Sequence, residues 1–126
     1  MVQSGEDSLQ SDPRWTIAVD LFNHQAWYQA HDAFEELWQE TIGPDRPLLQ
    51  ALVQIAVAHV HLERANLRGA TVLLGEALGR LAGCEDGSLG LNLNDLRACV
   101  SSRLKALQAG GDAADLPLPH LSGQLI

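Results

Sequence analysis

The sequence predicts an all-α protein, a single compact bundle of about five helices. Apolar residues recur at the three- and four-residue spacing of a helix face through most of the chain. No strand-like alternation of any length occurs, and prolines and glycines separate the helical segments at short intervals. The 126 residues, 46% of them hydrophobic, are sufficient for one domain with a buried core.

The chain divides into a helical domain and two tails. We expect a flexible N-terminal tail over residues 1–11, a helical bundle domain over 12–110 and an extended C-terminal tail over 111–126. Serine, glycine and acidic residues dominate the first tail, and prolines exclude a helix from the second. The leucines of the second tail are expected to lie against the bundle as an extended strap.

The first two helices are predicted from their boundaries. Asp12 is a favoured N-cap and Pro13 a favoured first helical residue, so the first helix begins there and ends near Asn23. The second runs from about Ala26 to Glu40. It stops before residues 43–47, where one glycine and two prolines make continuation unfavourable.

The third helix, from Leu48 to about Ala65, is expected to be the central one. It carries apolar residues on almost every side, which is typical of a helix that neighbours surround. A fourth helical pattern covers Gly69 to Leu81. Its Gly75 and Gly79 lie one turn apart and would let a neighbouring helix approach closely.

The last helix follows a glycine-rich loop over residues 83–90. Asn94 is its expected N-cap, and apolar residues at helical spacing continue to Leu107. We expect this helix to end at Gly110 and Gly111, because glycine commonly follows a helix C-terminus.

The charge balance excludes some classes of partner. Eight basic residues against sixteen acidic ones leave a formal net charge of -8. Without a surplus of Lys and Arg, we expect no binding to nucleic acid or to an anionic membrane. No signal-peptide pattern is present, and no apolar run reaches the roughly 20 residues of a membrane span. These features predict a soluble, cytoplasmic protein.

His31 is the first residue that points to chemistry. It shares a helix face with Trp27, Phe34 and Trp38, which form an aromatic lining, and Glu35 lies one turn further on at the border of that face. A titratable side chain on an apolar face is costly to bury unless another group satisfies it. His31 is therefore expected to have a polar partner.

The third helix carries a similar polar stripe. Gln54 and His61 lie on one side of it, two turns apart, whereas His59 points toward the side of Leu52 and Ile55. If the second and third helices pack antiparallel, the two polar stripes meet inside the bundle. The expected polar cluster consists of His31, Glu35, Gln54 and His61, joined by Arg64 and Asn66.

Three interpretations of this cluster are open. The favoured one is a buried hydrogen-bond network that fixes the packing of the helices. The others are a metal site formed by His31, Glu35 and His61, and an acid/base or small-ligand site active near neutral pH. The spacing matches no established zinc or di-iron motif, so we expect no metal or other cofactor.

Four segments together have the residues and the order of a known family: Leu21–Asn23, Tyr28–Asp32 with Glu35 and Trp38, Gln54–Ala58 with His61, and Arg64–Ala70. Over about Phe22 to Leu81 the chain resembles the domain of unknown function 309, a family of small all-helical bacterial and archaeal proteins. The resemblance implies a helical bundle and assigns no activity. It also implies a characteristic patch made of His31, Glu35, Trp38, Gln54, His61, Arg64 and Asn66.

One corner differs from the family. Its members usually carry Arg-Gly-Asn where this chain has Arg64, Ala65 and Asn66. Glycine tolerates a positive φ better than other residues do, so a slightly different corner is expected here.

The leading functional hypothesis is a non-enzymatic binding or self-association module. The tryptophans and the glycine-marked fourth helix would supply apolar surface for a homo-oligomer. The alternative is a metal-dependent or acid/base hydrolytic enzyme that uses His31, Glu35 and His61. The sequence does not indicate a ligand or substrate.

Overall fold

The computed structural model describes residues 8–111 and 113–123, and these residues fold as an all-α bundle. The helices are α1 (Pro13–Asn23), α2 (Trp27–Glu40), α3 (Arg46–Glu63), α4 (Leu67–Ala82) and α5 (Leu93–Gln108). Two short 3-10 helices, η2 (Leu9–Ser11) and η3 (Ser88–Gly90), precede α1 and α5. The predicted fold class is confirmed. Residues 1–7, 112 and 124–126 of the two expected tails lie outside the described part of the chain.

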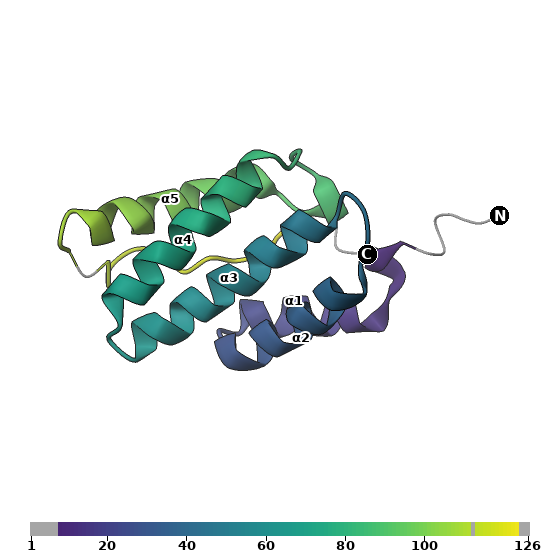
Figure 1. Ribbon diagram of the computed structural model, residues 1–126, viewed down its shortest axis with the longest axis horizontal. Coiled ribbons are helices and arrows are strands. Elements are labelled where there is room, and N and C mark those ends of the chain that lie inside the picture. The colour runs from purple at the N-terminus through teal and green to yellow at the C-terminus, as the bar shows by residue number, and fades with distance from the viewer. Residues whose placement is uncertain (1–7, 112, 124–126) are drawn as a thin grey trace.

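The central position of α3 is also confirmed. Figure 1 shows α3 in the middle, with α1 and α2 along one side and α4 and α5 along the other. Trp27 at the start of α2 stacks on His59 near the end of α3, with 4.5 Å between the ring centroids, so these two helices run antiparallel. Half of the residues of α3 are buried, including Leu48, Leu52 and Ile55.

Local capping explains where the helices begin. Asp12 accepts a hydrogen bond from the Arg14 N–H, as its N-cap position predicts. The predicted start of α5 at Asn94 is wrong, because the Asn92 side chain accepts from the Asp95 N–H and caps the helix two residues earlier. Similarly, α3 begins at Arg46, two residues before the expected position.

The aromatic residues join α1 to α2 and α3. Trp15 and Phe34 pack edge to face, and Phe22 contacts both Phe34 and Trp27 in the same way. All four are buried. Trp38 is half-buried, and the Arg46 guanidinium lies 4.2 Å from its ring centroid. The three predicted lining aromatics therefore belong mainly to the core.

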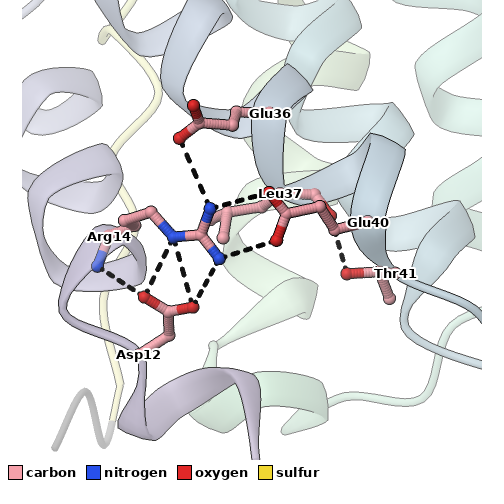
Figure 2. Close-up of polar contacts among 6 residues, drawn as sticks. All are labelled: Asp12, Arg14, Glu36, Leu37, Glu40 and Thr41. Carbon is pink, nitrogen blue, oxygen red and sulfur yellow. Dashed lines mark hydrogen bonds and ion pairs between the residues drawn. The ribbon is translucent and has the colours of Figure 1, made fainter.

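Arg14, on the surface of α1, links α1 to α2 by an ion pair with Glu40 (Figure 2). Its guanidinium donates to both carboxylate oxygens of Glu40, at 2.8 and 2.9 Å, and to Asp12. Glu36 lies 3.5 Å away. The hydrogen bonds from Arg14 hold the pKa values of Asp12 and Glu40 below their usual range. This exposed, fully paired cluster is structural, and its contribution depends on ionic strength.

After α5, the chain turns back and runs along that helix across the bundle (Figure 1). Leu121 is buried, and its N–H and C=O both bond to the Asn23 side chain, at 2.7 and 2.9 Å. The Asn92 N–H donates to the Ser122 carbonyl, and Leu91 forms an isolated bridge with Gly123. This C-terminal segment, residues 113–123, therefore closes one side of the bundle.

Two further features concern possible partners. A Cβ built at Gly75 or Gly79 would meet nothing within 4 Å, so the close helix neighbour expected at these glycines is not found in the described chain. In the same described residues, no helix combines the length and the apolar character needed to cross a membrane.

Candidate ligand-binding cavity

The residues of the predicted polar cluster do not converge. They lie in three separate places, each with its own polar partner. The cluster was mispredicted because a different face of α3 packs against α2 from the one expected. Because His59 faces Trp27 of α2, Gln54 and His61 lie on the side that faces α4 instead. The antiparallel packing of α2 and α3, a condition of the expected cluster, is present, but the face of α3 that meets α2 is not the expected one.

The first place is the surface of α2. His31 is 22% exposed, and its two ring nitrogens lie 3.2 Å from an Asp32 oxygen and 3.5 Å from a Glu35 oxygen. One ligand atom from each of these three side chains falls within 4.8 Å of the others. Among the described residues this is the only such trio, and His61 does not belong to it.

The second place lies between α3 and α4. The Gln54 amide donates to a Glu76 carboxylate oxygen at 2.8 Å, and Gln54 itself is 9% exposed. This contact links the two helices, which agrees with the structural interpretation for this one residue.

The third place is the corner between α3 and α4. The Asn66 amide lies 3.1 Å from His61 Nδ1, and its oxygen accepts from the Gly69 N–H, so Asn66 caps α4. Arg64 is exposed beside it. His61 and Asn66 are thus brought together as expected, but at the surface and away from His31.

A large cavity lies elsewhere in the described part of the chain. It has a volume of about 640 Å³ and is bounded by the start of α2, the end of α3, the start of α4, α5 and the C-terminal segment. Its wall is mainly apolar and includes Trp27, Leu62, Leu67, Leu116 and Leu118. Two corner residues with positive φ, Gln25 and Ala65, also line it.

His59 is one of the two buried polar residues of this cavity. It is 3% exposed, and its Nδ1 lies 2.8 Å from the Ile55 carbonyl, so Nδ1 carries a hydrogen and Nε2 is an acceptor. Nε2 is enclosed and has no partner in the described chain. Burial lowers the pKa of His59 to about 4, the Ile55 hydrogen bond opposes this shift, and the charge of Arg103 adds to it.

Arg103 is the second buried polar residue. It is 5% exposed, and its terminal nitrogens donate to the carbonyls of Ala113, Leu116 and Pro117 at 3.0 to 3.1 Å. Its Nε is enclosed without a partner among the residues described. Burial lowers the pKa of Arg103 from its usual value, because no carboxylate in the described segments pairs with it.

Sequence reasoning missed both residues, although the signal was present. His59 continues the stripe of Leu48, Leu52 and Ile55, and Arg103 continues that of Leu96, Val100 and Leu107. Each is the polar member of an otherwise apolar helix face. His31 satisfied the same criterion but lies at the edge of its stripe, where it stays partly exposed.

A family comparison agrees with the resemblance described above. Residues 15–73 match the model of a family described as Domain of unknown function (DUF309). No curated protein matches the chain. The matched part includes Trp27 and His59, whereas Arg103 and the C-terminal segment lie beyond it.

Proposed function

We propose that this protein is a non-enzymatic binding module whose ligand, a small and mainly apolar molecule, occupies the cavity beside Trp27, His59 and Arg103. The observation that carries the proposal is an enclosed histidine acceptor in the wall of a large apolar cavity.

The size and lining of the cavity support a small molecule as the ligand. Sites for small ligands typically have volumes of about 300–1,000 Å³ and an apolar wall with a few polar groups that fix orientation. Here the volume is about 640 Å³. The buried polar groups come from His59 and Arg103, and the exposed Gln25 and Glu63 also line the cavity. An aromatic ring, Trp27, forms part of the wall and offers a flat apolar contact surface.

The state of His59 supports binding over acid/base catalysis. A general base works best when its pKa lies near the operating pH, whereas the pKa of His59 is lowered to about 4. Its Nδ1 is also occupied by a backbone carbonyl of its own helix, and no carboxylate of the described residues holds it. A neutral imidazole of this kind is suited to accept a hydrogen bond from a ligand.

Titration with the neutral fluorescent probe N-phenyl-1-naphthylamine tests the proposal. We expect saturable binding of one probe per chain, with an increase in probe fluorescence. Leu118→Trp, at the cavity wall, should weaken binding at least about tenfold, because the larger ring occupies the space. Ile17→Trp is the matched control, since Ile17 is similarly exposed on α1, at 56% against 47% for Leu118, and is not part of the wall.

The proposal fails if the probe does not saturate. It also fails if both tryptophan variants bind the probe as well as the unmodified chain does. Circular dichroism of both variants shows whether the helical fold is retained, so that lost binding is not confused with unfolding.

Self-association is a second proposal with support of its own. The outer face of α4 carries Val72, 53% exposed, next to Gly75 and Gly79, where a Cβ would meet nothing within 4 Å. A second copy fits such a face because small residues allow close helix approach. The tryptophans give no support, since Trp15 and Trp27 are buried. Light scattering at high protein concentration tests it, and a monomer would refute it.

The remaining sequence hypotheses stay proposals. A cytoplasmic location and the lack of nucleic-acid binding still rest on composition. A hydrolytic site of His31, Glu35 and His61 gains no support, because His61 lies with Asn66 and away from the α2 trio.

A further inference from the structure

The two buried polar residues of the cavity leave complementary atoms without a partner. His59 Nε2 is an acceptor, and the Arg103 Nε–H is a donor. Both residues line the same cavity, and they are 3% and 5% exposed. A buried polar atom without a partner is costly, so a ligand that satisfies both atoms gains from each.

The charge of Arg103 restricts the ligand further. Three backbone carbonyls accept from its terminal nitrogens, but they carry no net charge that would balance the guanidinium. Glu63 also lines the cavity, and its side chain is exposed to solvent at the end of α3. A buried cation without a counter-ion among the residues that the structure describes favours a ligand group that can carry negative charge.

On the basis of the proposed binding function, we infer that the ligand is an apolar monocarboxylic acid whose carboxyl group lies between His59 and Arg103 and shares one proton with His59. A protonated carboxyl offers one O–H donor for Nε2 and one carbonyl acceptor for the Arg103 Nε–H. The equivalent form, carboxylate with imidazolium, contains the same number of protons. The apolar body of the acid contacts Trp27 and the leucines of the wall.

This assignment requires that binding takes up a proton. A free carboxylic acid is ionised near neutral pH, and His59 is neutral there because its pKa is about 4. One proton must therefore enter when the complex forms. The dissociation constant is expected to fall by up to about tenfold for each unit of decreasing pH between about pH 7.5 and about pH 5.5.

Few other titratable groups face His59. On α5 this is Arg103, which stays charged. Cys99 interacts with the charge of Arg103, and burial raises the pKa of its thiol, which therefore stays neutral in this range. On α3 it is Glu63, one turn from His59. On α2 the neighbour is the uncharged Trp27. Because Glu63 lines the cavity, Glu63→Gln measures what this carboxylate contributes to the pH dependence.

Isothermal titration calorimetry with phenylbutyrate and phenylbutanol tests the inference. The two molecules share an aromatic body, and only the first has a carboxyl group. Titration in buffers of different ionisation enthalpy gives the number of protons taken up. We expect about one proton for phenylbutyrate and none for phenylbutanol. This measurement uses the unmodified chain, so the proton count does not depend on whether a variant folds.

His59→Gln should remove the pH dependence, because an amide can still accept a hydrogen bond but cannot be protonated in this range. His61→Gln is the matched control on the same helix, outside the cavity wall. If phenylbutanol binds while phenylbutyrate binds more weakly or without proton uptake, the carboxylic acid is wrong and the binding function stands. If neither molecule nor the neutral probe binds, both proposals are wrong.

Discussion

At the scale of single residues, His59 makes stability depend on pH. It is buried between Trp27 and Ile55, and the neutral imidazole is the form that fits this position. Its pKa is lowered from 6.5 to about 4 by burial, so the unfolded chain binds its proton more readily than the folded chain does. The contribution of neutral His59 is complete above about pH 6.5 and is lost as the pH falls toward about 4.

We therefore expect the free energy of unfolding to fall by about 2 kcal/mol between about pH 7 and about pH 5 because of His59 alone. Urea denaturation at both pH values measures this loss. His59→Gln should remove most of it, whereas His24→Gln, at an exposed position after α1, should leave it unchanged. An equal loss in the His59 variant would show that another group causes the dependence.

Ala65 occupies a backbone position that favours glycine. It lies just after the end of α3 with a φ of 59°, and the Asn66 N–H beside it donates to the His61 carbonyl at 2.8 Å. Helices commonly end in this way with glycine at the left-handed residue. The departure from the family pattern at this corner thus keeps the backbone conformation that glycine would adopt and places a Cβ on it.

Ala65→Gly should stabilise the fold by about 1 kcal/mol, because it relieves the strain of a side chain in the left-handed region. Thermal unfolding followed by circular dichroism measures the change. Ala98→Gly is the control at an exposed position inside α5, and it should destabilise by about 1 kcal/mol. If both variants lose stability, the left-handed position of Ala65 carries no strain.

The candidate site was only partly predictable at this scale. Spacing correctly identified polar residues on apolar faces as informative, but His31 was chosen and His59 set aside. The reason is geometric. Spacing gives the angle between two side chains on one helix and does not say which neighbour each face meets. Arg103 was not identified from the sequence, because the carbonyls that it binds belong to a C-terminal segment without regular structure.

At the scale of helices, local chemistry explains most boundaries. Asp12 with Pro13 begins α1, as the sequence predicts, and the Asn66 side chain caps α4. The start of α5 was misplaced because two asparagines are close together, and Asp86 in the preceding loop accepts from the N–H groups of Leu93 and Asn94. No sequence pattern predicts that a loop carboxylate will accept from the first N–H groups of a helix that begins seven residues later.

The glycines of α4 differ in their surroundings, which gives a prediction within one helix. A Cβ at Gly75 or Gly79 would lie in open space, whereas a Cβ at Gly69 would lie 2.7 Å from the Asn66 amide nitrogen. Gly75→Ala and Gly79→Ala should each stabilise by about 1 kcal/mol through helix propensity. Gly69→Ala should give no net gain, because disturbing the Asn66 cap costs about as much.

Chemical denaturation of the three alanine variants, compared at one protein concentration, checks this order. Equal stabilisation by all three would mean that the Asn66 cap adjusts without cost. Destabilisation by Gly75→Ala or Gly79→Ala would indicate that the outer face of α4 is covered in solution, which would support the self-association proposal.

At the scale of the whole molecule, the C-terminal segment completes both the bundle and the cavity. Asn23 and Asn92 hold its far end at Leu121 and Ser122, and Arg103 holds its near end. The two ends have different functions. The far end covers the core between α1 and α5, whereas residues 114–118 of the near end form the wall of the cavity. We therefore expect the position of this wall to depend on Arg103.

Arg103→Met should loosen the cavity wall while leaving Leu121 in place. The variant removes three hydrogen bonds from a charged donor and should lower the free energy of unfolding by about 2 kcal/mol. Hydrogen exchange should quicken at Leu116, whose N–H donates to Ala113, and remain slow at Leu121, which Asn23 holds independently. Arg97→Met is the matched control, because Arg97 also lies on α5 but binds the carbonyls of Leu81 and Cys84 instead of the C-terminal segment, and should leave Leu116 protected. Equally fast exchange at Leu116 and Leu121 in the Arg103 variant would show instead that the segment detaches as one unit, and the cavity would then open only when the core beneath Leu121 is exposed as well.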